Sequence, residues 1–266
     1  MSNSGLRLED ASVSYRRRGQ PDLRAVDGVT LRVAPGEVVG LVGESGCGKS
    51  TLARAVCGLE RVASGSVTFD DLPISPLGLR RRPGRLRRIQ MVFQNPNASL
   101  NPRRVVRSQV EDGRAAHPSG PAGAPSAQEL LAQVGIAPEL AGRYPHELSG
   151  GQRQRVAIAR AMAAGPALLI GDEPIASLDA SLQARVAKLL RQLAVGSGAG
   201  LLFISHDLSV VRLIADRIVV MKVGRIVEEG ETERLWSAPQ QPYTRRLLAA
   251  IPAADGRGVL PGGDAL

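Results

Sequence analysis

With 266 residues, 43% of them hydrophobic, the chain can bury a full core, yet its longest apolar runs have the length of strands and are too short to span a membrane. The formal net charge of +9 rests on arginine, because the sequence holds only Lys49, Lys188 and Lys222 as lysines. Since only 3% of the residues are aromatic, stacking platforms are scarce, so we interpret the charge as an arginine-biased composition and expect no nucleic-acid partner.

Two isolated cysteines, Cys47 and Cys57, lack the spacing of a metal site and favour a reducing compartment. The first residues show no signal-peptide pattern of basic and apolar residues. We therefore expect a protein of the cytosol or of the cytosolic side of a membrane.

The first part of the chain alternates apolar and polar residues. Residues 6–35 follow this period of two, with a turn over 16–22, and predict an antiparallel β layer. The apolar run Val38–Val42 predicts a buried strand, and a helical pattern runs from about Thr51 to Leu59. Further strands are expected over residues 66–69 and 89–93.

The segment between the buried strand and the helix is rich in glycine. It has the pattern of a phosphate-binding loop, in which glycines let backbone N–H groups surround a phosphate at the start of a helix. Lys49 can reach the β- and γ-phosphates, and the Ser50 hydroxyl can hold Mg²⁺. The predicted nucleotide-binding residues are Gly43, Glu44, Ser45, Gly46, Cys47, Gly48, Lys49, Ser50 and Thr51.

Strand signals fade from residue 95 to about residue 163, where helices are interrupted by a Pro/Gly/Ala loop over 117–125. A further helix is expected over 181–193. The remaining strands are expected over residues 167–170, 201–204, 218–221 and 226–229. This order predicts an α/β fold, in which a P-loop NTPase core with an N-terminal antiparallel β layer carries an inserted helical subdomain.

Two carboxylates follow the apolar strand near residue 170. Asp172 and Glu173 would emerge at the carboxyl edge of the sheet, beside the phosphate-binding loop. There Asp172 would hold Mg²⁺ through its water shell, and Glu173 would act as general base on the attacking water. The alternative is a solvated turn, which we consider weaker because the pair follows a phosphate-binding loop.

A second anion site is expected just before the helix over 153–163. Ser149 has the position of an N-cap, and the two glycines after it expose backbone donors at the helix start. An ordinary linker is the alternative reading, but a linker would not lead directly into a helical pattern. The segment comprises Leu148, Ser149, Gly150, Gly151 and Gln152.

Together these motifs make the chain resemble the ATP-binding cassette (ABC) ATPases over residues 6–252. Residues 43–50 match the Walker A motif of that family, 148–152 its signature motif and 168–173 its Walker B motif. Gln94 matches the Q-loop glutamine, and His206 matches the switch histidine. The D-loop matches Ser177, Leu178 and Asp179, and Tyr15 falls where the family stacks an aromatic ring on adenine.

The resemblance implies roles for these residues. Glu173, His206 and Gln94 would be catalytic, with His206 bridging the γ-phosphate and Gln94 sensing the metal and the water. Ser50, Gln94 and Asp172 would hold Mg²⁺. Residues 148–152 would contact the ATP of a second cassette, so that two ATP sites are completed only in a dimer.

The implied domain organisation is one ABC ATPase domain over residues 1–252. Its core would comprise 1–94 and 164–235, and its helical subdomain 95–163. Residues 236–266 would form a C-terminal extension of the peptide-importer type.

Two segments resemble one subgroup, the ATPases of oligopeptide, dipeptide and nickel importers. They are Gln94–Arg103 and Pro239–Leu248, which match QDPYSSLNPR and H-P-Y-T-x-x-L-L elements. The resemblance implies a related ATPase as heterodimer partner, two permease subunits, an extracellular binding protein and a place on the cytoplasmic face of the membrane. Gly171 and Ile175 depart from the usual residues of the family, but neither position carries a reacting group.

Two alternatives remain at this level. The same ATPase could serve a nickel importer, because this subunit does not touch the cargo. A soluble cassette protein that remodels other complexes is more distant, since the chain shows no tandem cassette or zinc-binding cysteine cluster. A metabolite kinase is disfavoured because it would not need residues 148–152.

Overall fold

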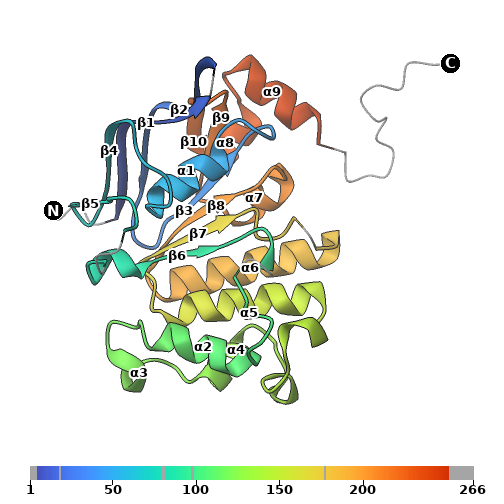
Figure 1. Ribbon diagram of the computed structural model, residues 1–266. Coiled ribbons are helices and arrows are strands. Elements are labelled where there is room, and N and C mark those ends of the chain that lie inside the picture. Colours follow the sequence, from blue (N-terminus) through green and yellow to red (C-terminus); the bar gives the residue numbers. More distant parts are fainter. Residues whose placement is uncertain (1–4, 18, 79–81, 97–98, 177, 252–266) are drawn as a thin grey trace.

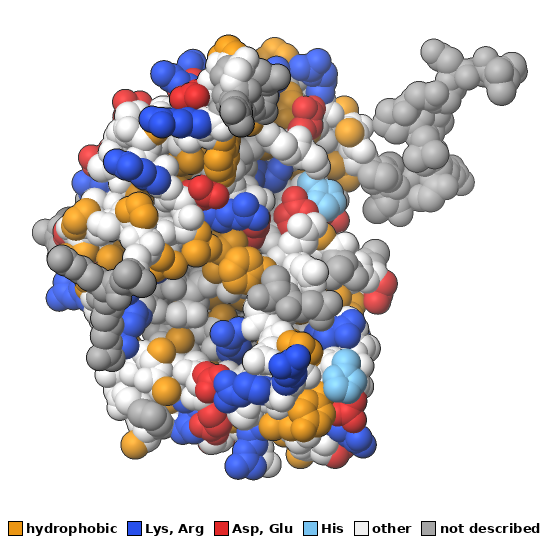
Figure 2. All heavy atoms as spheres, viewed as in Figure 1, with side chains coloured by type: hydrophobic (Ala, Val, Ile, Leu, Met, Phe, Trp, Pro, Cys, Tyr) orange, Lys and Arg blue, Asp and Glu red, His pale blue; other side chains and the backbone are white. Residues whose placement is uncertain are grey.

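The structure is a computed structural model that describes residues 5–17, 19–78, 82–96, 99–176 and 178–251. Its strands form two sheets, and the helices over residues 150–163, 180–196 and 208–214 cover one face of the larger sheet, while the helices over 106–133 lie beyond the first of these (Figure 1). Basic, acidic and hydrophobic side chains are interspersed on the face shown in Figure 2. Within the described ranges, no helix combines the length and the apolar character that crossing a membrane requires.

The smaller sheet is the antiparallel layer expected at the start of the chain. Its strand order is β2-β1-β4-β5. These strands are β1 (Leu6–Arg17), β2 (Gln20–Val33), β4 (Ser64–Phe69) and β5 (Leu72–Pro73). Leu6 and Leu8 of β1 are buried, as the period of two predicts, whereas Ala11, Ser12 and Val13 are buried in succession where the register with β2 shifts. The pairing of Arg17 with Gln20 makes the connection shorter than the turn expected over 16–22.

The larger sheet has the strand order β10-β9-β3-β8-β7-β6. Its strands are β3 (Val38–Val42), β6 (Ile89–Val92), β7 (Leu168–Asp172), β8 (Gly200–Ile204), β9 (Arg217–Lys222) and β10 (Arg225–Glu231). All neighbouring pairs are parallel except β9 with β10. Every residue of β3, β7 and β8 is buried, which explains why these strands are apolar runs rather than alternating ones.

The predicted helices differ from the observed ones mainly at their ends, and the helices after residue 207 were not predicted. They are α1 (Lys49–Val56), α2 (Val106–Arg114), α3 (Gly120–Gly123), α4 (Ala127–Gln133), α5 (Gly150–Ala163), α6 (Ala180–Gly196), α7 (Leu208–Ile214), α8 (Thr232–Ser237) and α9 (Pro242–Ala249). Helix α1 stops three residues before the expected Leu59 because Gly58, with φ +71°, turns the chain away. The short α3 lies within the segment predicted as a loop over 117–125.

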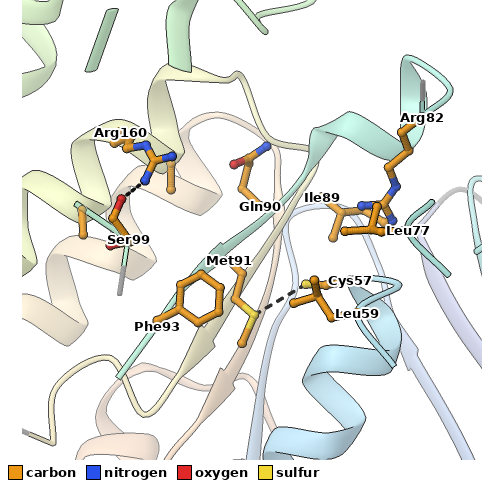
Figure 3. A pocket seen from close by; sticks show the side chains of 12 residues that line it. Cys57, Leu59, Leu77, Arg82, Ile89, Gln90, Met91, Phe93, Ser99 and Arg160 are labelled. Atoms are coloured by element: carbon orange, nitrogen blue, oxygen red, sulfur yellow. Dashed lines mark hydrogen bonds between the residues drawn. The ribbon is translucent and has the colours of Figure 1, made fainter. Parts of the chain in front are cut away.

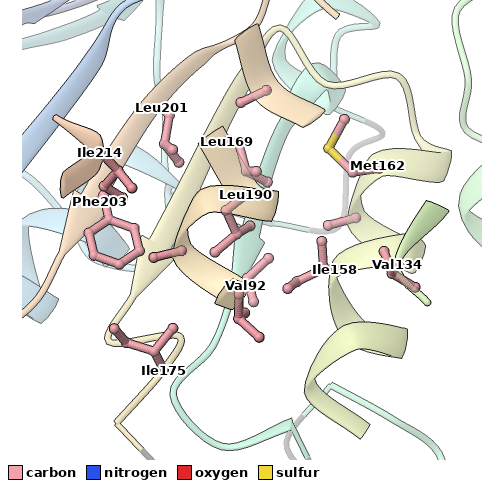
Figure 4. Close-up of a cluster of buried hydrophobic side chains, with 14 of the residues drawn as sticks. Val92, Val134, Ile158, Met162, Leu169, Ile175, Leu190, Leu201, Phe203 and Ile214 are labelled. Atoms are coloured by element: carbon pink, nitrogen blue, oxygen red, sulfur yellow. The ribbon is translucent and has the colours of Figure 1, made fainter. Parts of the chain in front are cut away.

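Two hydrophobic clusters lie on opposite faces of the larger sheet. Val39 and Leu41 of β3 pack with the antiparallel sheet and α1, whereas Val38 and Val42 of the same strand pack with the helices. Figure 4 shows the second cluster, in which Phe203 of β8 lies with residues of α5 and α6. Because successive side chains of a strand point to opposite faces, each central strand contributes to both clusters. The larger sheet therefore fixes both layers.

We expect Phe203→Ala to lower the free energy of unfolding by about 3–5 kcal/mol, because the ring is fully buried and its removal leaves a cavity. Urea unfolding followed by circular dichroism measures this loss. Leu213→Ala, on the exposed side of α7, is the matched control and should cost less than about 1 kcal/mol. Equal losses in the two variants would contradict the packing described here.

Candidate functional site

The candidate site lies at the carboxyl edge of the larger sheet. Strands β3, β6, β7 and β8 run parallel, so their last residues meet at one edge. The segments that follow these strands begin at Gly43, Phe93, Glu173 and Ser205. The edge therefore brings together most of the residues that the motifs singled out.

The loop after β3 is held in a conformation that requires glycine at two positions. Gly43 has φ +152° and Gly48, at the start of α1, has φ +108°. A Cβ atom on Gly43 would overlap the carbonyl oxygen of Met221, and one on Gly48 would overlap that of Ala25. Neighbouring strands thus hold the loop from outside, and larger residues cannot be placed there without moving the backbone.

Lys49 is buried inside its own loop. Its Nζ donates hydrogen bonds to the carbonyl oxygens of Gly43 at 2.7 Å and of Glu44 at 2.9 Å. The ammonium group is therefore held at the centre of the loop, where a phosphate would be surrounded by the backbone N–H groups at the start of α1. This placement fits the predicted role of Lys49 in binding the β- and γ-phosphates.

Ser50 and Asp172 meet directly. The Ser50 hydroxyl donates a hydrogen bond of 2.8 Å to Oδ1 of Asp172, which is the last residue of β7 rather than the first residue after it. Burial raises the pKa of Asp172, the hydrogen bond from Ser50 opposes this shift, and the charge of Glu173 adds to it. A hydroxyl oxygen and a carboxylate oxygen, both able to bind a metal ion, thus lie side by side next to the loop.

This oxygen pair fits a magnesium ion bound together with nucleotide. Mg²⁺ is usually held by one or two protein oxygens, with waters and phosphate oxygens completing its shell. The described residues contain no group of three or more His, Cys, Asp or Glu side chains that could hold a metal ion by themselves. A metal at this edge would therefore need ligands from the nucleotide in addition to Ser50 and Asp172.

Glu173 lies between two of the predicted catalytic residues. Its Oε2 accepts a hydrogen bond from Nε2 of Gln94 at 3.4 Å and lies 3.3 Å from Nδ1 of His206. The His206 side chain is 58% exposed and that of Glu173 only 17%, so the histidine lies between the carboxylate and the solvent. The structure brings together Gln94, Glu173 and His206 from three different strand ends.

The backbone of Glu173 has an unusual conformation. Its φ is +47°, in the left-handed region that non-glycine residues rarely adopt. The peptide is held there because its N–H donates a 3.0 Å hydrogen bond to the carbonyl of Ile204 at the end of β8. Strained backbone of this kind concentrates at functional sites, where it directs a side chain that would otherwise point elsewhere.

Tyr15 lies beside the first turn of α1. Its half-buried ring places the hydroxyl 3.4 Å from Oγ1 of Thr51, to which it donates a hydrogen bond. The residue predicted to stack on adenine therefore stands beside the last residue of the predicted nucleotide-binding segment.

The signature segment lies at the start of α5. Ser149 and Gln152 form a capping box, in which each side chain bonds the backbone N–H of the other residue. A Cβ atom on Gly151 would lie 2.5 Å from Leu182, so this glycine allows α5 to approach α6. Ser149 is exposed whereas Leu148 is buried, and among the described residues no hydrogen bond or ion pair joins this segment to the loop over 43–50 of the same chain.

The predicted D-loop is described only in part. Ser177 lies outside the described residues. Leu178 is buried, and Asp179 caps α6 by accepting a hydrogen bond from the N–H of Leu182 at 3.0 Å. A structural role as N-cap is thus in place for Asp179 in addition to the predicted one.

A groove of about 300 Å³ lies beside β6, between α1 and α5 (Figure 3). Phe93 is part of its lining and directly precedes Gln94, and the carbonyl of Phe93 accepts a hydrogen bond from Gln154 of α5. Arg160 of α5 and Met91 of β6 line it as well. The catalytic edge and this groove are therefore linked through two consecutive residues of one strand end.

Sequence reasoning missed two contacts to the phosphate-binding loop. The N–H of Gly224, in the β9–β10 turn, donates to the carbonyl of Cys47 at 2.9 Å, and the hydroxyl of Tyr243 in α9 accepts from the N–H of Glu44 at 3.1 Å. Tyr243 belongs to Pro239–Leu248, which was singled out only as a subgroup marker. The match of this segment to the importer subgroup could have drawn attention to Tyr243, but nothing in the pattern indicates which residue the tyrosine contacts.

Known proteins share both the sequence and the fold. A family model described as ABC transporter matches residues 26–176. The oligopeptide transport ATP-binding protein AppF of Bacillus subtilis is 46% identical over 240 residues, covering 89% of this chain and 73% of AppF. The oligopeptide transport ATP-binding protein OppF of Escherichia coli is 48% identical over 243 residues, covering 88% of this chain and 71% of OppF.

Solved structures agree with these relatives. The ATP-binding cassette MJ0796, solved as a dimer in a post-hydrolysis state with ADP and Pi, has a TM-score of 0.72 and 29% identity, covering 85% of this chain and 98% of that one. The protein cbiO1 of Clostridium perfringens, part of the ABC transporter complex cbiONQ, has a TM-score of 0.72 and 29% identity, covering 88% and 91%. The predicted fold class is confirmed, and the chain belongs to the ATP-binding, ATP-hydrolysing cassettes of the ABC transporter family.

Proposed function

We propose that this chain is the ATP-hydrolysing subunit of an ABC importer for peptides and that it works as one of a pair of cassettes. The observation that carries the proposal is the position of Glu173, between Gln94 and His206 and next to the bonded Ser50–Asp172 pair. This arrangement provides a base for water beside a place for a metal-bound triphosphate. The names of relatives such as AppF and OppF support oligopeptides as cargo.

In the proposed reaction, the loop over residues 43–50 binds the phosphates of ATP, and Lys49 neutralises charge on the β- and γ-phosphates. Ser50 and Asp172 would hold Mg²⁺, with Gln94 as the further predicted ligand, and the bound ion would withdraw charge from the phosphate oxygens. Glu173 takes a proton from water while the water oxygen bonds to the γ-phosphorus and the bond to the leaving ADP oxygen breaks. The products are ADP and phosphate.

His206 and Gln94 orient the base in this proposal. Both contact the same Oε2 atom of Glu173, so they fix the direction in which the carboxylate accepts a proton. Because His206 is exposed, it can also reach the γ-phosphate from outside. A third contact, the hydrogen bond from the backbone N–H of Glu173 to Ile204, keeps the residue at the end of β7 while the proton is transferred.

We infer that a second cassette completes the site. Ser149 is exposed at the start of α5 and is not hydrogen-bonded to the phosphate-binding loop of its own chain. This suits a helix start that binds the phosphate of an ATP molecule held by another subunit. The dimeric state of MJ0796 with ADP and Pi supports the same assembly. A related but different ATPase is the partner that the subgroup resemblance favours.

The proposed assembly also includes two permease subunits and an extracellular binding protein, which would place this chain on the cytoplasmic face of a membrane. Within the chain, we propose a core of residues 1–94 and 164–235, an inserted helical subdomain over 95–163 and a C-terminal extension over 236–266. The helices α2 to α5 all fall within the inserted range, which supports this division.

A transport assay separates the two candidate cargoes. We expect deletion of the gene in its source organism to reduce uptake of a labelled oligopeptide, and a copy of the wild-type gene to restore it. A gene carrying Glu173→Gln should not restore uptake. Loss of nickel accumulation with normal peptide uptake would favour the nickel alternative, and unchanged transport of both would contradict the importer role.

Lys49→Ala should abolish measurable ATP binding, because the variant loses the one cation held inside the loop among the described residues. Binding of a fluorescent ATP analogue to the purified chain measures the effect. Lys188→Ala, on the exposed side of α6, is the matched control and should bind like the wild type. Normal affinity in the Lys49 variant would overturn the assignment of the loop.

Glu173→Gln should slow ATP turnover by about 100-fold or more while leaving ATP affinity near normal, because the amide keeps the shape of the side chain but cannot accept the proton. Phosphate release by the reconstituted cassette pair measures turnover. Glu233→Gln, an exposed carboxylate of α8, is the control and should leave turnover unchanged. Full turnover in the Glu173 variant would exclude this residue as the base.

Asp172→Asn should raise the Tm of the nucleotide-free chain near neutral pH and weaken binding of Mg²⁺ with ATP. Burial raises the pKa of Asp172 in the folded chain, so its ionised form opposes folding above that pKa and the opposition disappears below it. The difference in Tm should therefore shrink as the pH falls through the raised pKa. A difference that stays constant from about pH 4 to pH 8 would contradict this cause.

A further inference from the structure

The C-terminal helix α9 reaches the phosphate-binding loop through one side chain. Tyr243 is 6% exposed, and its hydroxyl oxygen accepts a hydrogen bond of 3.1 Å from the backbone N–H of Glu44. The two residues are 199 positions apart in the sequence. Two segments from the C-terminal part of the chain thus contact the loop: the end of β9 with the turn that follows it, and helix α9.

This contact acts on the same peptide group as Lys49. The N–H of Glu44 and the carbonyl of Gly43 belong to one planar unit, in which the two bonds point in opposite directions. The carbonyl accepts from Nζ of Lys49 at 2.7 Å, and the N–H donates to Tyr243 at 3.1 Å. The lysine holds the peptide from inside the loop and the tyrosine holds it from outside.

Tyr243 is itself held firmly in place. Its ring lies 5.0 Å from Nζ of Lys222, a cation–π contact to the last residue of β9. Leu247 and Leu248 of the same helix pack on the hydrophobic cluster that covers the larger sheet. Burial raises the pKa of the tyrosine, so the hydroxyl stays protonated near neutral pH. The helix therefore presents a fixed acceptor to the loop.

We propose that Tyr243 is a positioning residue for the phosphate-binding loop. By holding the N–H of Glu44 away from the loop interior, it keeps the Gly43–Glu44 peptide in one orientation, with the carbonyl toward Lys49. The loop then meets the triphosphate already ordered, and the ordering cost of binding is reduced. This inference rests on the proposed function of the loop as the nucleotide site.

Tyr243→Phe tests the inference because it removes the hydroxyl and keeps the ring, its burial and its contact with Lys222. We expect the Kd for ATP with Mg²⁺ to rise about five-fold, the size of effect expected for one lost hydrogen bond. Turnover at saturating ATP in the cassette pair should stay near the wild-type value, since Tyr243 touches no reacting atom. Amide hydrogen exchange over residues 43–48 of the nucleotide-free chain should become faster.

Two further variants make the result decisive. Thr244→Val removes the neighbouring hydroxyl of the same helix at similar volume and should leave both Kd and exchange unchanged. Lys49→Ala reports on the nucleotide site itself and should lose ATP binding. Unchanged Kd and exchange in Tyr243→Phe, alongside a normal response to Lys49→Ala, would overturn the positioning role while leaving the proposed function in place.

Two other outcomes also contradict the inference. A lower Tm with unchanged Kd and exchange in Tyr243→Phe would show that the hydroxyl serves packing alone. If Lys49→Ala binds ATP like the wild type, the nucleotide site is assigned wrongly, and the positioning role fails together with it.

Discussion

The site depends on one constraint, which is that four parallel strands end at the same edge of one sheet. Every residue of β3, β7 and β8 is buried, so these strands can carry polar and charged groups only where they stop, and β6, buried at Ile89 and Val92, ends at the same edge. The Ser50–Asp172 pair and the group around Glu173 therefore arise from packing as much as from chemistry. The hydrophobic clusters on both faces fix the strands and thereby fix the distances at the edge.

Much of the fold could be predicted because its central strands are continuous apolar runs bounded by glycine or by carboxylates. The fold class and the antiparallel layer are confirmed. Helices α7 to α9 were not predicted, since each is short and its pattern covers barely two turns. The end of α1 was wrong by one turn because the left-handed Gly58 overrides a helical pattern that continues past it.

The candidate site shows where sequence reasoning stops. Motif spacing could place Glu173, Gln94 and His206 at strand ends, but no pattern reveals the left-handed backbone of Glu173 or the shared contact at one of its carboxylate oxygens. Likewise, the subgroup marker around Tyr243 is visible in the sequence, whereas its hydrogen bond to Glu44 follows from the docking of α9 on the core. The roles of these residues remain predictions that the geometry supports.

The capping box at the start of α5 has a consequence for assembly. A serine hydroxyl offers one proton and two lone pairs, and Ser149 spends only a lone pair on the N–H of Gln152. Its proton stays free to be donated outward, toward an anion on an opposing surface. In the proposed dimer, the same oxygen would cap the start of α5 through its lone pair and donate its proton to the partner's anion, so the capping bond could stay in place.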